Sequence, residues 1–498
     1  MSTKVCLVLT EKTIEKNLSL LEKYREFIDI AELRADCLNQ SEILYLRRFP
    51  EKAKLPVILT VRRKADGGFF TGGEGARMTI FARGLAFARS NPEHNFSYID
   101  MESDFHAAGI EEAARAFNIK IIRSLHSKKN IKNPAQVIHE LRQTETDIPK
   151  LAFYAESLNN VTEIFKAAKK NAFTSEQSSS FVVSVMGAFG IPLRLLAKKI
   201  NSEIVYTFSR EYIKKNGCEN SLLDPVTLKT LYRFDIINSD TKIFGVTGKD
   251  VNGSLSPQIH NSGFAKWNIN SVYIPIPANT AKEALEFAEA VPIKGLSVTA
   301  PFKTDIISQI HSVSEDSKSI GAVNTLILQN KKWIGHNTDV DGFKQALMEF
   351  LDEENLQHYK IAIIGAGGAA KAVARVVKLL KGKACIFNRT AEKAQKLAEQ
   401  YGFKWALLDT VNIKQLTAYS DLIIQTTIAG MEPNIKEDPL SFYTFKGKEK
   451  IFDLIYRPET TQLLKRARAA GCEVCNGYKM LEYQAQHQFK TFAEKDYD

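Results

Sequence analysis

Short apolar runs recur through the first part of the chain, with helical patterns between them. Eight such runs precede residue 210, at 4–10, 28–36, 56–62, 96–102, 119–126, 149–155, 180–187 and 203–209. Each has the length of a strand, and intervening segments such as NPAQVIHELRQT carry the spacing of an amphipathic helix. Eight strand–helix units in succession predict a parallel (β/α)8 barrel, the TIM-barrel fold, with an open doubly wound sheet as the alternative.

Polar side chains lie at the ends of several of these predicted strands. They are Glu32, Arg34, Asp36, Arg62, Glu102 and His126, with Lys150 inside the sixth run and Arg194 after the seventh. Barrel active sites form at the C-terminal ends of strands and in the loops that follow. Taken singly, each of these residues fits a structural ion pair. Together they predict cations, carboxylates and one imidazole at one barrel mouth.

Lys150 lies within the apolar stretch TDIPKLAFYA, residues 146–155. One interpretation is an edge lysine whose ammonium reaches water. The other is a lysine kept uncharged by the barrel interior and by nearby cations such as Arg194, so that its amine attacks a carbonyl. Its place on the sixth strand, beside the strand that ends in His126, favours the nucleophile.

The clearest motif of the second part is KIAIIGAGGAAKAVARVV, which starts at Lys360. A strand leads directly into glycines and then into a helix, with Ala370 at the third small position of the fingerprint. Glycines let the backbone approach a pyrophosphate, which then sits on the helix N-terminus. The pattern predicts a dinucleotide-binding Rossmann domain. Its phosphate turn consists of Gly365, Ala366, Gly367, Gly368 and Ala369.

The next predicted strand, KACIF, ends at Asn388, Arg389 and Thr390, with Lys393 one turn further on. An acidic residue at this place would bind the ribose 2′-hydroxyl of NAD. Neutral and basic residues suit a 2′-phosphate, so the sequence favours NADP(H). The alternative is a helix cap with a solvent-facing arginine.

Reduction of a ketone also needs a proton donor. Lys303 in VTAPFK and Asp339 in GHNTD are candidates, because a lysine held by a carboxylate stabilises a developing alkoxide. Ser254 and Ser256 offer hydroxyl groups to a substrate carboxylate, and Asn324 is a further polar loop residue. The alternative for all of them is a role in turns and caps.

The motifs of residues 242–498 resemble shikimate dehydrogenase. They are SLSPQIHN, VTAPFK, IGAVNT, GHNTDVDGF, GAGGAAKA, NRT, Gly430-Met431 and NGYKMLEYQ. The resemblance implies NADP-dependent reduction of 3-dehydroshikimate to shikimate, with Lys303 and Asp339 as the catalytic pair. It assigns substrate binding to Ser254, Ser256, Thr299, Asn324, Tyr456 and Gln484. Gly253, Ser297 and Gln425 depart from the family pattern of histidine, asparagine and asparagine at these places.

Residues 4–195 resemble type I 3-dehydroquinate dehydratase through ELRAD, TVRRKADGG, YIDME, SLH, DIPKLA and MGAFGIPLR. The resemblance implies an imine on Lys150, His126 as proton-transfer residue and Glu102 as the group that orients it. Substrate positioning falls to Glu32, Arg34, Arg62 and Arg194. Asp66 stands for the usual glutamate and Leu193 for the usual serine, and residues 220–224 do not match the substrate-covering loop.

The two resemblances predict consecutive steps of the shikimate pathway in one fused chain. The predicted domains are a dehydratase at 1–238, a substrate-binding domain at 239–340 completed by a helix in 476–498, and an NADP-binding domain at 341–475. The alternatives are a class I aldolase barrel, a dehydrogenase that prefers quinate, and a half that serves only regulation or scaffolding.

Composition narrows the setting of these activities. No apolar run reaches the roughly 18 residues of a membrane span. Six scattered cysteines suggest a reducing, cytoplasmic setting, and Cys472-x-x-Cys475 lacks the second pair of a zinc site, so no metal is expected. The net charge of +10 comes from dispersed lysines, which argues against nucleic-acid binding and suits anionic small molecules. The sequence does not give the oligomeric state.

Overall fold

The computed structural model describes residues 3–86, 89–175 and 180–497. The chain divides into two compact units, residues 1–293 and 294–498, which are taken in turn below. The domain boundaries expected from the sequence motifs, after residues 238, 340 and 475, stay predictions.

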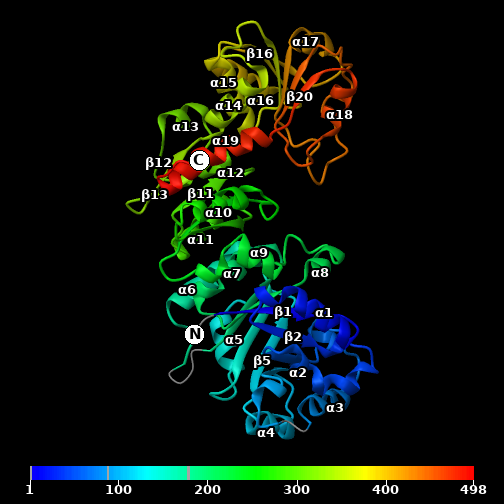
Figure 1. Ribbon diagram of the computed structural model, residues 1–498. Helices are drawn as coiled ribbons and strands as arrows, with labels where there is room; N and C mark the ends of the chain where they lie inside the picture. Colours follow the sequence, from blue (N-terminus) through cyan, green and yellow to red (C-terminus); the bar gives the residue numbers. More distant parts are fainter. Residues whose placement is uncertain (1–2, 87–88, 176–179, 498) are drawn as a thin grey trace. The chain divides into compact units, whose positions relative to one another are not determined.

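The first unit contains a nearly closed barrel of eight parallel strands (Figure 1). They are β1 (Lys4–Leu9), β2 (Ile30–Arg34), β3 (Val57–Thr60), β4 (Tyr98–Glu102), β5 (Lys120–Ser127), β6 (Ile148–Tyr154), β7 (Val182–Met186) and β8 (Ile204–Thr207). The hydrogen-bonded order is β7-β6-β5-β4-β3-β2-β1-β8. Each predicted strand is confirmed in place, because a run buried on both faces must be apolar almost throughout.

Helices and short turns connect these strands, and two further helices follow β8. The helices are α1 (Ile14–Tyr24), α2 (Phe49–Ala53), α3 (Glu74–Leu85), α4 (Ala108–Ala116), α5 (Pro134–Leu141), α6 (Leu158–Lys169), α7 (Ile191–Leu195), α8 (Arg210–Lys215) and α9 (Pro225–Thr230). Side-chain caps fix several starts: Thr13 accepts from the Lys16 amide and Asn133 from the Gln136 amide. The unit also contains β9 (Lys242–Gly248), α10 (Ser256–Lys266), β10 (Ser271–Pro277) and α11 (Ala281–Ala290), with β9 and β10 parallel.

Period-two alternation explains what fills the barrel. One buried layer comprises Cys6, Val8, Ile30, Ile58, Tyr98, Ile122, Ile148, Val182, Ile204 and Tyr206. A side chain two positions further along a strand lies on the same face, one step nearer the C-terminal mouth. On this basis Glu32 lies above Ile30 on the same face of its strand, Ser124 above Ile122 and Lys150 above Ile148. The apolar layer therefore lies directly beneath a polar one.

The second unit opens with β11 (Gly295–Val298), α12 (Phe302–Asp305), β12 (Ser312–Val313), α13 (Glu315–Ile320), β13 (Thr325–Gln329), β14 (Lys332–His336) and α14 (Asp339–Leu351). Strand β13 is antiparallel to both β11 and β14, and β12 is parallel to β14. The C-terminal helix α19 (Tyr478–Ala493) packs on α14, where the Gln484 backbone comes so close to Gly342 that a Cβ there would lie 2.7 Å from its nitrogen.

A second parallel sheet has the order β17-β16-β15-β18-β19-β20. Its elements are β15 (Lys360–Ile364), α15 (Gly368–Leu379), β16 (Lys383–Asn388), α16 (Ala391–Tyr401), β17 (Lys404–Leu407), α17 (Ile413–Ala418), β18 (Leu422–Gln425), β19 (Lys450–Asp453), α18 (Gln462–Ala469) and β20 (Glu473–Cys475). This doubly wound order reverses at β15, which confirms the predicted Rossmann fold. Dinucleotides bind at such a reversal, beyond the carboxyl ends of the strands.

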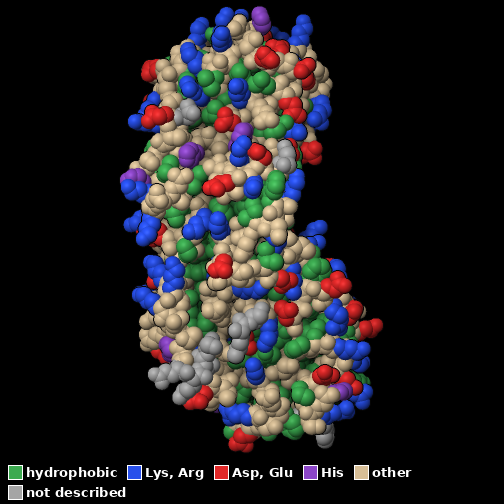
Figure 2. Space-filling model, turned by 60° about the vertical axis from the view of Figure 1, so that its left-hand side comes forward, with side chains coloured by type: hydrophobic (Ala, Val, Ile, Leu, Met, Phe, Trp, Pro, Cys, Tyr) green, Lys and Arg blue, Asp and Glu red, His purple; other side chains and the backbone are tan. Residues whose placement is uncertain are grey.

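Surface properties agree with the composition. Within the described ranges, no helix is both long and apolar enough to cross a membrane. On the face drawn in Figure 2, lysine and arginine side chains are interspersed with acidic ones instead of forming one continuous basic patch.

Candidate active sites

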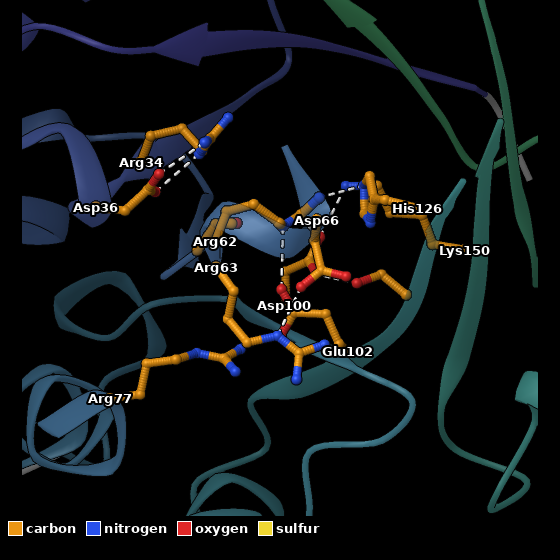
Figure 3. Close-up of polar contacts among 12 residues, drawn as sticks. Arg34, Asp36, Arg62, Arg63, Asp66, Arg77, Asp100, Glu102, His126 and Lys150 are labelled. Atoms are coloured by element: carbon orange, nitrogen blue, oxygen red, sulfur yellow. Dashed lines mark hydrogen bonds and ion pairs between the residues drawn. The ribbon is translucent and has the colours of Figure 1, made fainter. Parts of the chain in front are cut away.

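The polar layer of the barrel brings most of the predicted dehydratase residues together. Glu32, Arg62, Glu102, His126 and Lys150 come from five successive strands or strand ends and are linked through shared contacts. Figure 3 labels the last four of them. Glu32, Arg62, Glu102 and Lys150 are each less than 5% exposed. Charges so deeply buried persist only when they are paired, so the cluster is a single electrostatic unit.

Lys150 faces carboxylates. Its Nζ donates to Asp100 Oδ2 at 2.7 Å and lies 3.7 Å from Glu32 Oε1. The same ammonium lies 4.1 Å from the centre of the Tyr206 ring, within the range of a cation–π contact. Lys150 is therefore an inward-facing residue, and the alternative of an edge lysine that reaches water is wrong.

His126 lies beside Arg62, whose Nη1 contacts its Nε2. Burial, followed by the charges of Arg62 and Lys150, lowers the pKa of His126 well below 6.5. Nδ1 of His126 has no hydrogen-bond partner among the described residues. The imidazole is therefore neutral near pH 7, the state that a general base needs. Because a guanidinium only donates, Nε2 is the accepting nitrogen and Nδ1 carries the proton.

Glu102 does not take the position expected of it. It pairs with Arg62 at 3.2 Å and with the fully buried Arg77, and among the described residues no direct hydrogen bond joins it to His126. Burial, followed by the charge of Asp100, raises the pKa of Glu102. Arg62 contacts both Glu102 and His126 and so links the carboxylate to the imidazole.

Two predicted substrate residues have other partners. Arg34 forms a two-pronged pair with Asp36, at 2.9 and 2.7 Å. Arg194 donates to the carbonyl oxygens of Tyr206 at 3.2 Å and Val185 at 3.3 Å, and burial lowers its pKa to about 10. The expectation that Arg194 lies beside the Lys150 amine stays a prediction.

Asp100 is the site residue that the sequence reasoning missed. It is 1% exposed and contacts Lys150, Arg62 at 3.0 Å and Ser124 at 2.6 Å. The signal was present in YIDME, where Asp100 and Glu102 share one face of the strand with the core residue Tyr98. An acid on the core-facing side of a buried strand needs a cationic partner, which could have singled it out.

A second cluster lies in the second unit around Lys303. Its Nζ contacts Asp339 Oδ2, and Asn324 donates to the other oxygen of Asp339 at 2.9 Å. Asn324 also donates to Thr338 Oγ1 at 3.0 Å and to Gln484 Oε1 at 3.3 Å. Lys303, Asp339 and Asn324 therefore form one chain of contacts, and Gln484 joins it through Asn324.

For the other predicted substrate residues of the dehydrogenase part, the contacts described are with groups other than Lys303 and Asp339. Thr299 accepts the Phe302 amide through its backbone carbonyl. Burial raises the pKa of the partly buried Tyr456, which follows β19. In the first unit, Ser254 Oγ donates to Ser256 Oγ at 3.2 Å. Their roles toward substrate stay predictions.

The glycine turn after β15 has the shape that a pyrophosphate needs. Gly365 has φ +111°, and a Cβ there would lie 2.5 Å from Thr426 Oγ1, while a Cβ on Gly367 would meet open space. Helix α15 starts behind Gly367 without a side-chain cap and without an acidic residue in its first turn. Its first amide groups are thus directed at an anion site. The candidate residues fit a dinucleotide.

The comparisons with known proteins match both parts. Residues 5–231 match the model of type I 3-dehydroquinase, 246–326 the shikimate dehydrogenase substrate binding domain, and 347–454 shikimate / quinate 5-dehydrogenase. A shikimate dehydrogenase (NADP(+)) of Caldanaerobacter subterraneus subsp. tengcongensis is 37% identical over 53% of this chain and 95% of its own length. The chain belongs to the shikimate dehydrogenase family, with a type I 3-dehydroquinase domain ahead of it.

Further relatives support both halves of this assignment. A shikimate dehydrogenase (NADP(+)) of Methanococcus aeolicus is 37% identical over 52% of this chain and 94% of the relative. The bifunctional chloroplastic 3-dehydroquinate dehydratase/shikimate dehydrogenase of Arabidopsis thaliana is 29% identical over 98% of this chain and 81% of the relative. A lyase and an oxidoreductase are joined in one chain, as the resemblances implied.

Two of the three departures from the shikimate dehydrogenase pattern, Gln425 and Ser297, are buried and make hydrogen bonds. Gln425 is fully buried and spans the loop after β18, donating to the carbonyls of Thr427 at 3.1 Å and Ala429 at 3.2 Å. It holds the segment that leads to Gly430, which has φ +100°, and to Met431, which is 39% exposed. Ser297 donates to Gln488 Oε1 at 2.6 Å on the C-terminal helix. Gln425 thus braces the backbone of the loop after β18, and Ser297 links β11 to helix α19.

Of the departures in the dehydroquinase domain, Leu193 is buried in helix α7, and Asp66 and the 220–224 segment lie between the named helices and strands. Asp66 pairs with Arg63 at 2.6 Å. In the 220–224 segment, Asp224 caps helix α9 by accepting the Thr227 amide at 3.0 Å, and Leu223 accepts the Phe208 amide. This segment is therefore tied to the scaffold at its end.

No group of acidic, histidine or cysteine side chains within the described ranges is arranged to hold a metal ion.

Proposed function

We propose that the barrel dehydrates 3-dehydroquinate to 3-dehydroshikimate through an imine on Lys150, and that the dehydrogenase part reduces this product to shikimate with NADPH. The observation that carries the first half is the contact network of Lys150 and His126. Both face inward from adjacent strands, within one buried set of charges.

The chemistry follows from these two side chains. Lys150 attacks the C3 ketone through Nζ. Overall, its ammonium and the ketone give one water and an iminium that withdraws electrons from C2. Neutral His126 removes a C2 proton, and its imidazolium then protonates the departing C1 hydroxyl. Water hydrolyses the iminium and frees Lys150. Glu32, Arg34, Arg62 and Arg194 stay candidates for positioning hydroxyls and carboxylate.

Borohydride trapping tests the proposal. The purified chain is treated with borohydride in the presence of 3-dehydroquinate, and the peptide that contains Lys150 is weighed by mass spectrometry. A substrate-sized adduct on Lys150 is expected. An unmodified Lys150 under turnover conditions would show that no imine forms there. Retro-aldol cleavage, assayed in parallel, separates dehydration from the aldolase alternative.

His126→Ala should separate imine formation from proton transfer. The variant keeps the amine, so the Lys150 adduct should still form, whereas dehydratase kcat should fall about 10²–10⁴-fold because general-base catalysis contributes that much. His139→Ala, on helix α5 outside the network, serves as the matched control. Full turnover in His126→Ala would remove His126 from the mechanism.

The pH dependence of the dehydratase should reflect the depressed pKa of His126. Histidine acts as a base in its neutral form, which dominates above its pKa. Because the pKa of His126 lies well below 6.5, the loss of dehydratase kcat/KM on the acid side should occur at lower pH. Dehydratase kcat/KM should therefore stay level as the pH is lowered from 7.5 to 6.5. A loss centred at or above pH 6.5 would contradict a neutral resting imidazole.

For the second half, the Lys303–Asp339 pair supports ketone reduction. When bound, the reduced dinucleotide supplies the hydride. Lys303 then donates its proton to the carbonyl oxygen. Asp339 holds the lysine by contacting its Nζ, and Asn324 in turn holds Asp339. The turn at residues 365–369 would hold the pyrophosphate, and Asn388, Arg389, Thr390 and Lys393 would face the ribose phosphate. Turnover with shikimate and with quinate, compared side by side, identifies the preferred substrate.

Arg389→Ala should weaken NADPH selectively. Arg389 and Lys393 are exposed after β16, and Asn388 fastens this corner by donating to the Thr390 carbonyl at 3.0 Å. Loss of a charge-assisted hydrogen bond costs about 1.5–3 kcal/mol, so KM for NADPH should rise about 10–100-fold while KM for NADH is unchanged. Lys383→Ala, at the opposite end of β16, is the control. Equal effects on both cofactors would refute a 2′-phosphate contact.

A further inference from the structure

Asp100 connects the groups of the barrel mouth. Its Oδ2 lies 2.7 Å from Lys150 Nζ and 3.0 Å from an Arg62 guanidinium nitrogen, while Oδ1 accepts from Ser124 Oγ at 2.6 Å. The carboxylate thus has partners on the neighbouring strand and on the strand beyond it, and its position is fixed. Figure 3 shows it below Arg62 in the same group of side chains as Glu102.

The carboxylate of Asp100 keeps its charge. Burial alone would raise the pKa of Asp100, but Arg62, Lys150 and His126 together hold it far below its usual range. Such a group is a poor proton acceptor, which argues against Asp100 as the base that frees the amine. It is instead a fixed negative charge next to the reacting nitrogen.

Imine formation preserves a positive charge at that nitrogen. The ammonium and the ketone give an iminium and one water: Nζ loses two protons to the former carbonyl oxygen, the C–O bonds break, and one N–H remains. The iminium withdraws electrons from C2 only while it stays protonated. A negative charge at hydrogen-bond distance stabilises this protonated form.

We propose that Asp100 is a catalytic residue of the dehydratase, the counter-ion that keeps the Lys150 imine protonated during the removal of the C2 proton. The proposal rests on the imine chemistry proposed above. Glu32 is the less suitable candidate, because its Oε1 lies 3.7 Å from Nζ and already accepts from Thr60 Oγ1 at 2.7 Å. Asp100 has the shorter contact and belongs to the strand closer to β6.

Other titratable groups face the same space, and their charges also affect the protonation of the imine. They are Cys6 on β1, Glu32 and Arg34 on β2, Arg62 after β3, Glu102 on β4, His126 on β5 and Tyr206 on β8. Burial raises the pKa of the Cys6 thiol and of the Tyr206 phenol well above their usual values, so both stay neutral. The acidic groups recorded within ion-pair distance of Nζ are Asp100 and Glu32.

The experiment measures the protonation of the imine directly. Cyanoborohydride reduces the iminium and not the neutral imine, whereas borohydride reduces both. The ratio of Lys150 adducts formed by the two reagents with 3-dehydroshikimate, followed against pH, therefore gives the midpoint of imine deprotonation. Removal of an adjacent opposite charge shifts such a midpoint by about 1–3 pH units, so Asp100→Asn should lower it by this amount. Glu32→Gln should lower it less.

Each outcome decides the question. An unchanged midpoint in Asp100→Asn, or an equal shift in Glu32→Gln, overturns the proposal. If Asp100→Asn forms no adduct, Asp100→Glu decides: a restored adduct supports the role of the charge, and its absence overturns it. Dehydrogenase activity of the same preparations shows that the chain is intact. An absent adduct in the unmodified chain would instead refute the imine mechanism itself.

Discussion

Replacing Lys150 with arginine should abolish dehydratase turnover and leave the dehydrogenase activity of the same chain intact. Arginine keeps a cation opposite Asp100 and Glu32, but its guanidinium does not form an imine with a ketone. Removal of the nucleophile of a covalent mechanism costs on the order of 10⁴–10⁶-fold in kcat in enzymes where it has been dissected. The measurement is dehydration of 3-dehydroquinate, with adduct formation followed by mass spectrometry.

The choice of arginine matters because Lys150 is buried among carboxylates. Lys150→Ala would leave Asp100 and Glu32 without this partner, and breaking a buried pair in this way destabilises a protein by about 3–5 kcal/mol. Loss of activity in the alanine variant alone would therefore be ambiguous. Lys166→Arg, at an exposed position on helix α6, is the matched control. Dehydratase turnover above about a hundredth of normal in Lys150→Arg would exclude the imine.

The barrel was predictable because its evidence is periodic. Each strand is a short apolar run buried on both faces, and eight of them alternate with helical segments. Most of the polar residues predicted at this mouth also lie in one cluster, since parallel strands bring their C-terminal ends to one mouth. Glu32, His126 and Lys150 show this clearly, because each follows a core residue of its own strand on the same face.

Side-chain partnerships were not predictable in the same way. Sequence spacing does not tell which of two cations a carboxylate chooses, because the choice depends on distances across the barrel. Glu102 was expected at His126 and pairs with Arg62 and Arg77. Asp100 was overlooked because one acid inside a strand is read as a structural partner. The two strand carbonyls to which the Arg194 guanidinium donates could not be read from the sequence either.

In the second part, the fingerprint turn was predictable from local context, whereas the Lys303–Asp339 contact joins residues 36 positions apart. The resemblance of VTAPFK and GHNTD to family motifs implied this pair. The motifs did not indicate which side chain holds Asp339 in place, and the contacts of Asn324 show this. Its side-chain amide donates to Asp339 and Thr338, and its side-chain oxygen accepts the Thr338 amide at 2.8 Å. Asn324 thereby fixes the carboxylate that holds the lysine.

Lys303→Met should reduce dehydrogenase kcat about 10²–10⁴-fold, the usual contribution of a positioned proton donor, while KM for 3-dehydroshikimate changes little. Methionine retains the long apolar stem of lysine, which packs near Gly368, where a Cβ would lie 3.4 Å from the Lys303 Cδ. Asp339 keeps its contact with Asn324 in this variant, so the local fold should survive. Steady-state kinetics with NADPH give kcat and KM separately.

Lys318→Met, at an exposed position on helix α13, is the matched control and should have normal kinetics. Dehydration of 3-dehydroquinate by Lys303→Met should also be normal, because the barrel residues of the dehydratase are untouched. Each activity is thus a control for the other. Lys150→Arg should lose the dehydratase activity and keep the dehydrogenase activity, and Lys303→Met should do the reverse. A Lys303→Met chain that raises KM without lowering kcat would make Lys303 a binding residue, and proton donation would have to come from another group.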